Sequence, residues 1–271
     1  VVGSSESERV GEGLYRRGEP EATDFRFIAA VDAVSGKMLW QMPCPEGESL
    51  LPQTLTVCAG KVFCQTTAGI ECLDAATGHK LWRAERSTLA KRMSFSSPTI
   101  VATGDVLLCA DRKVEDKNDQ LAASVGSVLW GVHGWNEPGF SRTGKSELVA
   151  YSATDGTQLW SVECKEGYNS PVDLFVVDDT VWVGYDFKAY DLHTGSLIRS
   201  LDWQPVGVGM AHHRCYRNKA TESLIITGRS GVEIVDMEEG WQGNNSWIRG
   251  TCQYGVMPAN GMIYVPPDAC A

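Results

Sequence analysis

Short apolar or alternating runs recur along the chain, and each is followed by a polar turn and a second short run. The first runs of these pairs are residues 27–31, 69–73, 148–151 and 232–235. Short runs of this kind, bounded by Gly, Asp, Asn and Ser, are typical of β-hairpins. The pattern therefore predicts a fold made of short antiparallel strands.

The turn between the two runs has the form Asp-x-x-x-Gly, with an aromatic or long side chain four positions after the glycine. An Asp side chain can accept hydrogen bonds from backbone groups two or three residues ahead, and Gly supplies the positive φ that closes a tight turn. The copies are residues 32–36 before Trp40, 74–78 before Trp82, 152–156 (with Ser first) before Trp160, 191–195 before Arg199, and 236–240.

The copies begin at positions 32, 74, 152, 191 and 236, so they follow one another after 42, 78, 39 and 45 residues. A period of about 40 residues is typical of propeller and solenoid repeats. A second pair of short runs lies upstream of a turn, as in residues 55–58 and 61–64 around Ala59 and Gly60. Four strands per repeat make the blade of a β-propeller.

The sequence thus predicts an all-β fold, a β-propeller of four-stranded antiparallel blades, of which five are recognisable. Four blades span residues 50–84, 94–162, 170–203 and 208–248, and the fifth combines strands near each end of the chain. We expect residues 1–24 to be a mobile lead-in and residues 25–271 to form one domain, with an insertion at about 112–146.

Composition excludes some functions. The 271 residues include 24 basic and 34 acidic ones, a net charge of −10, and no long basic run, which argues against nucleic acid as a partner. No apolar stretch approaches the roughly 18 residues that cross a bilayer. Nine cysteines are many for a cytosolic protein, so two alternatives stay open: disulfides, or small buried side chains within strands, for which Cys58, Cys64, Cys72 and Cys109 are the best fit.

The repeated Ala-Tyr/Leu-Asp/Ser-x-x-x-Gly-x-x-Leu-Trp pattern resembles the tryptophan-docking repeats of the PQQ-like β-propellers, the quinoprotein alcohol dehydrogenase-like and BamB-like superfamily. The resemblance covers most of residues 25–266 and implies that Trp40, Trp82 and Trp160 dock between neighbouring blades. Arg199 departs from that pattern. Residues 212–221 and 249–255 also look like segments of propeller proteins of planctomycete-type bacteria. Since this superfamily usually has seven or eight blades, the chain is expected to be part of a larger ring.

Quinone-dependent members of the superfamily use an adjacent Cys-Cys disulfide, and quinohaemoproteins use Cys-x-x-Cys-His; neither motif is present. The absence of both motifs argues against the hypothesis that the protein is a dehydrogenase with PQQ and calcium as cofactors. The densest chemical cluster is residues 212–219. Alternation along a strand would place His212 on one face and His213, Cys215 and Arg217 on the other. That face could bind copper or zinc if Cys252 or His193 supplied further ligands; the alternative is a Cys215–Cys252 disulfide with arginines bonded to nearby oxygens.

We therefore expect a non-catalytic, extracytoplasmic or periplasmic scaffold whose mouth binds a protein or small ligand. A place in a membrane-associated complex would fit this role, with no transmembrane segment in the chain. The alternatives are a quinoprotein-like oxidoreductase, or a metal or redox module that uses His212, His213 and Cys215.

Overall fold

A computed structural model describes residues 2–5, 25–86, 88, 98–112, 145–165, 172–184, 187–201, 216–228, 231–251 and 254–266. Within these ranges the regular secondary structure consists of β-strands. Contacts divide the chain into two compact units: unit 1 comprises residues 1–133 and 148–161, and unit 2 comprises residues 134–147 and 162–271. The expectation of a single domain stays a prediction.

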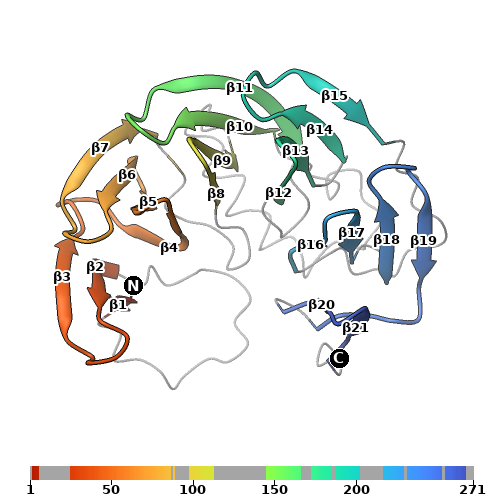
Figure 1. The fold of residues 1–271 in the computed structure, drawn as a ribbon, viewed down its shortest axis with the longest axis horizontal. Coiled ribbons are helices and arrows are strands. Elements are labelled where there is room, and N and C mark those ends of the chain that lie inside the picture. The colour runs from red at the N-terminus through yellow and green to blue at the C-terminus, as the bar shows by residue number, and fades with distance from the viewer. Residues whose placement is uncertain are drawn as a thin grey trace, which may run out of the picture. The chain divides into compact units, whose positions relative to one another are not determined.

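Unit 1 contains two sheets and most of a third, and the strands of each sheet pair in chain order (Figure 1). The first sheet is β1 (Val2–Ser5), β2 (Phe25–Val31) and β3 (Met38–Pro43); the second is β4 (Leu50–Cys58), β5 (Lys61–Thr66), β6 (Gly69–Asp74) and β7 (Lys80–Glu85); the third is β8 (Thr99–Thr103), β9 (Val106–Arg112), β10 (Lys145–Ser152) and β11 (Gln158–Lys165). The pairs β1–β2, β2–β3, β4–β5, β5–β6, β6–β7 and β8–β9 are antiparallel.

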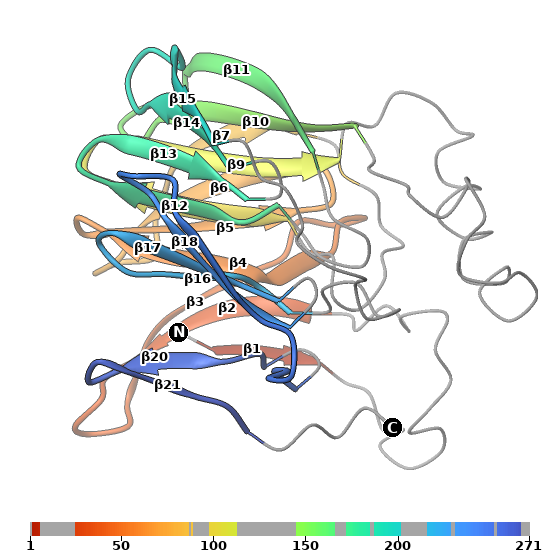
Figure 2. The same ribbon diagram turned by 90° about the vertical axis from the view of Figure 1, so that its right-hand side faces the viewer.

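Unit 2 repeats the same up-and-down order, and Figure 2 shows its hairpins from the side. The strands are β12 (Leu174–Val177), β13 (Thr180–Val183), β14 (Lys188–Asp191) and β15 (Leu197–Ser200) in one sheet; β16 (Lys219–Ala220), β17 (Leu224–Thr227), β18 (Val232–Asp236) and β19 (Gln242–Asn245) in the next; and β20 (Met257–Ala259) with β21 (Met262–Tyr264) in a third.

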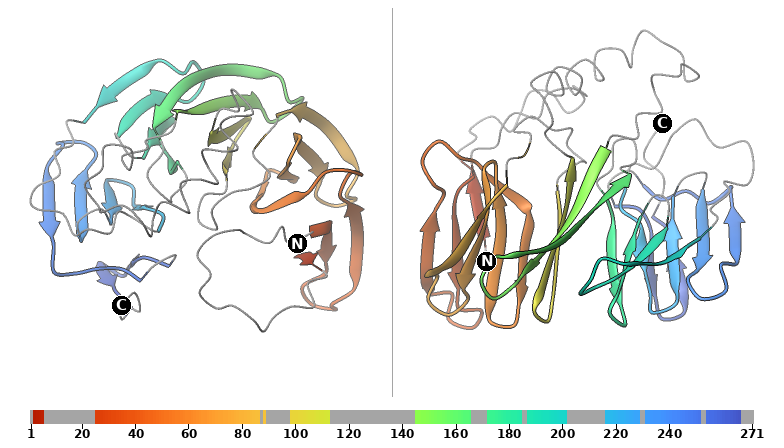
Figure 3. Two further views of the ribbon diagram at one scale, coloured as in Figure 1. Left: turned by 180° about the vertical axis from the view of Figure 1, so that it is seen from behind. Right: turned by 90° about the horizontal axis from the view of Figure 1, so that it is seen from above.

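The strands of each four-stranded sheet alternate in direction, so the connections at their two ends differ. We call each row of strand ends an edge, which here does not mean an outer strand of the sheet. At one edge, which we name the turn edge, the first strand joins the second and the third joins the fourth through short turns. At the other, the loop edge, the second strand joins the third and the sheet joins its neighbours. The longer connections, residues 86–98, 113–144 and 201–218, all leave from the loop edge. Figure 3 shows the strands of each sheet running side by side between these edges.

The Asp-x-x-x-Gly turns form as the sequence predicts. Asp74 Oδ1 accepts hydrogen bonds from the backbone N–H of Ala76 (3.1 Å) and Thr77 (2.8 Å) and from the Thr77 hydroxyl (2.7 Å). Gly78 then takes a φ of +73°, and its N–H donates to the Asp74 carbonyl at 2.8 Å. These bonds lower the pKa of Asp74, first through the Thr77 hydroxyl. The carboxylate form therefore holds the turn.

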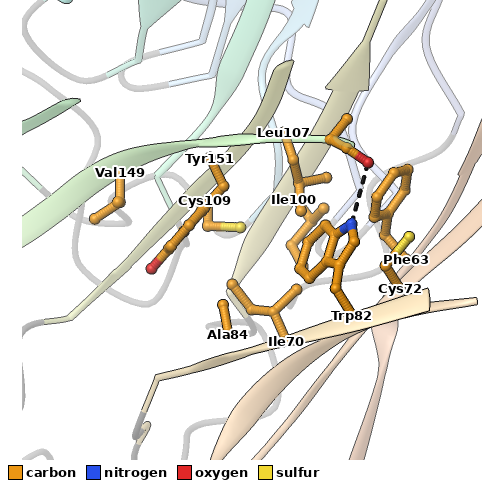
Figure 4. Close-up of a cluster of buried hydrophobic side chains, with 11 residues drawn as sticks. Phe63, Ile70, Cys72, Trp82, Ala84, Ile100, Leu107, Cys109, Val149 and Tyr151 are labelled. Atoms are coloured by element: carbon orange, nitrogen blue, oxygen red, sulfur yellow. Dashed lines mark hydrogen bonds between the residues drawn. The ribbon is translucent and has the colours of Figure 1, made fainter. Parts of the chain in front are cut away.

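Apolar side chains join the sheets of unit 1 face to face. One cluster combines Ile28 and Trp40 of the first sheet with Val62, Cys64 and Leu73 of the second. The other face of the second sheet packs on the third sheet through a cluster of buried residues, shown in Figure 4. Its members are Phe63, Ile70, Cys72, Trp82, Ala84, Ile100, Leu107, Cys109, Val149, Tyr151 and Ala153. Both faces of the middle sheet are thus covered, as in stacked propeller blades.

Two expectations differ from the structure. Residues 2–5, expected in the lead-in, form β1, which pairs with β2; the rest of the lead-in lies outside the described ranges. The disulfide prediction is not supported among the described residues, because the thiols of Cys58, Cys64, Cys72 and Cys109 are free, as the alternative of small buried side chains predicts. The expected pair, Cys215 and Cys252, lies outside the described residues. Cys64, Cys72 and Cys109 pack as small apolar side chains within the clusters between sheets. Burial raises the pKa of Cys72 to about 11 and that of Cys109 to about 12, which keeps both thiols protonated at neutral pH.

Candidate functional site

Two of the tryptophans that the resemblance singles out reach from one sheet of unit 1 to the next. Trp40 Nε1 donates a hydrogen bond to the carbonyl of Ala75 at 2.9 Å, and Trp82 Nε1 donates to the carbonyl of Ala153 at 3.1 Å. The second bond is the dashed line in Figure 4. In both cases the acceptor is the residue directly after the first residue of the next turn motif. Trp160 is 9% exposed, and its docking role stays a prediction.

Two of the glycines that end the turns, Gly78 and Gly156, also make room for an indole ring. A Cβ atom on Gly78 would lie 2.5 Å from Cδ2 of Trp40, and one on Gly156 would lie 2.6 Å from Cε3 of Trp82. The positive φ of these glycines serves the turn, while the missing side chain lets the ring of the preceding sheet lie close to the backbone. One residue therefore serves both the turn and the sheet–sheet contact.

Arg199 occupies the tryptophan position in unit 2 and makes the corresponding bond. Its Nη1 donates to the carbonyl of Met237 at 2.6 Å, and Met237 directly follows Asp236, the first residue of the next turn. Leu201 lies 3.6 Å from where a Cβ of Gly240 would stand, so an aliphatic side chain lies against the turn glycine. The residue that departs from the sequence pattern thus keeps its polar contact.

The candidate metal ligands can be placed only in part. His212, His213, Cys215 and Cys252 lie outside the described residues. His193 is at the turn edge of its sheet, where its N–H donates to Asp191 Oδ1, whereas Arg217 is at the loop edge. Within the described ranges no group of three or more His, Cys, Asp or Glu side chains is arranged to hold a metal ion.

Arg217 lies beside a buried carboxylate at the loop edge of unit 2. Its Nη1 is 3.7 Å from Oδ1 of Asp173, a residue that is 2% exposed. Oδ2 of the same carboxylate accepts a hydrogen bond from the backbone N–H of Asn218 at 2.9 Å. Asp173 directly precedes β12 and Asn218 directly precedes β16, so this contact joins the innermost strands of the two four-stranded sheets.

Two neighbours complete this group. Gly184 follows β13, its N–H donates to the Asp173 carbonyl at 2.7 Å, and a Cβ on it would meet Asp173 Cβ at 2.9 Å and Asn218 Nδ2 at 3.3 Å. Lys219 begins β16, and its pKa is lowered, chiefly by burial; Asp173 acts against this shift and Arg217 adds to it. We name Asp173, Arg217, Asn218, Lys219 and Gly184 the inner-strand cluster.

Tyr216 fixes the backbone just before the inner-strand cluster. Its ring is 4% exposed and lies against two glycines: a Cβ on Gly228 would fall 1.9 Å from the phenol oxygen, and one on Gly255 would fall 2.6 Å from Cδ2. Its hydroxyl donates to the carbonyl of Gly231 at 3.4 Å. Because the ring is held in this slot, the next residue, Arg217, points away from the apolar packing and toward Asp173.

Unit 1 carries a different polar group at its loop edge, made of ion pairs. Arg83 donates to Glu71 Oε1 at 2.6 Å and to Glu48 Oε1 at 2.9 Å, and Thr66 donates to Glu48. Burial would raise the pKa of Glu48, but the bonds from Thr66 and Arg83 outweigh it and the pKa is lowered. Both carboxylates are thus compensated by neighbours, and the group ties the connection before β4 to β6 and β7. Its arrangement indicates that these ion pairs stabilise the fold and do not bind a ligand.

The sequence analysis does not single out Asp173. Its partner Asn218 lies 45 positions further along the chain, so only the stacking of two sheets brings them together. Their positions could have indicated the contact, because Asp173 and Asn218 each directly precede the first strand of a repeat.

Comparisons with known proteins agree with this architecture. The family model described as outer membrane protein assembly factor BamB matches residues 21–132 and 117–242. Comparison with curated protein sequences gives no match. The crystal structure of BamB from Moraxella catarrhalis is similar, with a TM-score of 0.53, 14% identity, and coverage of 89% of this chain and 64% of that one. The chain thus spans less than two thirds of that protein's length.

A weaker likeness links the chain to a quinohemoprotein alcohol dehydrogenase from Pseudomonas putida HK5, with a TM-score of 0.47, 12% identity, and coverage of 89% of this chain and 42% of that one. At such identities structural likeness speaks for the fold alone, and it confirms the predicted all-β propeller with four-stranded antiparallel blades. Since the family model covers most of the sequence, the chain belongs to the BamB family of PQQ-like β-propellers.

Proposed function

We propose that the protein is a non-catalytic, extracytoplasmic binding platform, which holds a protein partner at the loop edge of its sheets as part of a membrane-associated complex. The observation that carries the proposal is the difference between the two edges. The turn edge consists of short turns closed by hydrogen bonds, whereas residues 86–98, 113–144 and 201–218 all connect strands at the loop edge. Sheets whose long connections all join strands at the same end are a usual design of a binding surface.

Membership of a family described as an assembly factor supports a binding role, and we extend that role to this chain as part of the proposal. Among the described residues there is no helix long and apolar enough to span a bilayer. The docking contacts of Trp40 and Trp82 support the same role, since they would keep the sheets rigid under an attached partner.

Site-specific photocrosslinking tests the proposal with two matched alanines of one sheet. Ala68 connects β5 to β6 at the loop edge and Ala76 lies in the turn between β6 and β7. A photoreactive phenylalanine derivative replaces each in turn in cells that produce the protein. We expect a discrete adduct with a second protein from position 68 and none from position 76. Adducts only from position 76, or none from either, would contradict a loop-edge platform.

The non-catalytic part has its own test. The purified protein is incubated with PQQ and Ca²⁺, and dye reduction is followed with an alcohol or a sugar as substrate. We expect no turnover above the protein-free control, and steady quinone-dependent dye reduction would overturn this part of the proposal.

A further inference from the structure

Charge is divided unevenly between the edges of the two four-stranded sheets of unit 2. The turn segments at residues 178–179, 191–196, 221–223 and 236–241 contain seven carboxylates and no Lys or Arg. They are Asp178, Asp179, Asp191, Glu222, Asp236, Glu238 and Glu239. Among the described residues the loop edge of the same sheets carries Lys188, Arg217, Lys219 and Arg249, and its carboxylates, Asp173 and Glu233, are 2% and 4% exposed. An anionic ligand would therefore meet repulsion at the turn edge and cations at the loop edge.

Both cations of the inner-strand cluster lie near the Asp173 carboxylate. Oδ2 of Asp173 accepts a hydrogen bond from the backbone N–H of Asn218 at 2.9 Å, and Nη1 of Arg217 is 3.7 Å from Oδ1. Lys219 is close enough to both for each to affect its pKa, which burial lowers. A lowered lysine pKa means that its surroundings disfavour the ammonium ion, and a second anion close to it would reverse that effect.

The Asn218 side chain adds an amide to this group. The residue is 3% exposed, and neither Nδ2 nor Oδ1 has a hydrogen-bond partner in the described structure. A buried polar group without a partner costs about 1–3 kcal/mol, so such a group is commonly completed by water or a ligand. Gly184 lies against Nδ2, since its absent Cβ would stand 3.3 Å away. The amide thus lies between the end of β13 and the start of β16, and its residue stands between the two cations in the chain.

We propose that Arg217, Asn218 and Lys219 form a carboxylate-binding site that takes an acidic segment of a protein partner. The guanidinium can hold a carboxylate through two parallel N–H groups, the ammonium supplies a second charge, and the asparagine amide pairs with a peptide group, which also carries one donor and one acceptor. Asp173 makes a dianion such as phosphate a poorer ligand, because it adds a negative charge to the same site. The inference rests on the proposed binding function and names the chemistry of its partner.

Fluorescent peptides of six residues provide the probes for a binding assay on the full chain. One carries two Glu side chains and an amidated C-terminus, a second carries Gln in place of Glu and a free C-terminal carboxylate, and a third is neutral with Gln and an amidated C-terminus. Fluorescence anisotropy at low salt reports binding. We expect the Glu peptide to bind more tightly than the neutral one. Tighter binding of only the peptide with the free C-terminal carboxylate would contradict an acidic segment as the ligand. Equal binding of all three would overturn the proposal.

The variants R217Q, K219Q and N218L separate the three contributions, and K61Q, which removes one cation from the turn edge of unit 1, is the matched control for net charge. We expect about tenfold weaker binding in R217Q and K219Q, because hydrogen bonds to charged groups are worth about that much, and unchanged binding in K61Q. An equal loss of peptide affinity in K61Q would show that binding depends on net charge alone and would contradict the proposed site. If R217Q fails to fold, the half-buried Lys219 still provides the test.

The failure of this inference can be told from a failure of the proposed function. Should position 68 crosslink a partner while no carboxylate peptide binds, the platform stands and the inner-strand cluster is not its carboxylate site. Excess inorganic phosphate serves as a competitor: displacement of the acidic peptide only at concentrations far above the peptide's Kd agrees with the proposal, and tighter binding of phosphate than of peptide contradicts it.

Discussion

Replacing Trp82 by alanine tests whether the packing of one sheet on the next, and with it the stability of the fold, depends on a single buried indole. The side chain is 8% exposed, lies between two sheets of unit 1, and donates to the carbonyl of Ala153. A tryptophan buries roughly 150–250 Å², which at ~25 cal/mol per Å² corresponds to about 4–6 kcal/mol as an upper bound. Large-to-small substitutions of this kind cost about 3–5 kcal/mol in measured series.

We therefore expect W82A to lose about 4 kcal/mol of unfolding free energy, a large share of the ~5–15 kcal/mol that folded domains have. At ~2–4 °C per kcal/mol for a chain of this size, the melting temperature should fall by roughly 8–16 °C. Circular dichroism and differential scanning calorimetry measure both quantities. A phenylalanine variant, W82F, keeps an apolar ring and loses the N–H, so it should lose less than W82A does.

Trp247 is the matched control because it is 86% exposed. W247A should change the unfolding free energy by no more than about 0.5 kcal/mol, as exposed substitutions do. If W82A melts together with the wild type, or if W247A is equally destabilised, then the reasoning about indoles between sheets is wrong and the docking role predicted for Trp82 has to be abandoned.

The remaining predictions concern the turns and the arginine. G78A should be more destabilising than G60A, by about 1 kcal/mol or more, since both glycines have positive φ but only the first would press a Cβ against Trp40; equal denaturation midpoints would contradict this. R199A should lower the unfolding free energy by about 1–3 kcal/mol, because the hydrogen bond to a backbone carbonyl is lost, and R199K should restore only part of it; an R199A midpoint equal to that of the wild type would argue against a docking role. Because the pKa of Asp74 is lowered in the fold from 3.8, its contribution is fully present above pH 3.8 and is lost as the pH falls through the folded value; thermal melts from pH 6 to 2 should show a smaller acid loss in D74N than in the wild type, and equal losses would remove Asp74 from the explanation.

Much of the fold could be predicted from the sequence because its determinants are local. The turns depend on an Asp and a Gly within five residues, and the structure shows the expected bonds at Asp74 and the positive φ at Gly78. The strands between turns follow from short apolar runs, whose contacts are mostly with the adjacent strand. Period, turn chemistry and strand pattern agree with one another, which is why the propeller class was recognisable.

The candidate site could not be predicted in the same way, because its contacts span long distances along the chain. The bond between Asn218 and Asp173 depends on how two sheets stack, and no sequence pattern near either residue signals it. Arg199 shows the opposite difficulty: it departs from the tryptophan pattern, yet its guanidinium donates to the same kind of acceptor. The sequence pattern records residue type, whereas the fold requires only a donor of suitable reach at that point.

The acceptors of these contacts between sheets are the main-chain oxygens of Ala75, Ala153 and Met237. Every residue type offers the same oxygen, so a change on the receiving side need not be matched by a compensating change in the donor. Because only the donor side chain depends on residue type in these contacts, repeats can be duplicated, can change order and can diverge without coordinated mutations. This tolerance gives a physical reason why successive copies of the module within one chain can differ so widely in sequence and still stack.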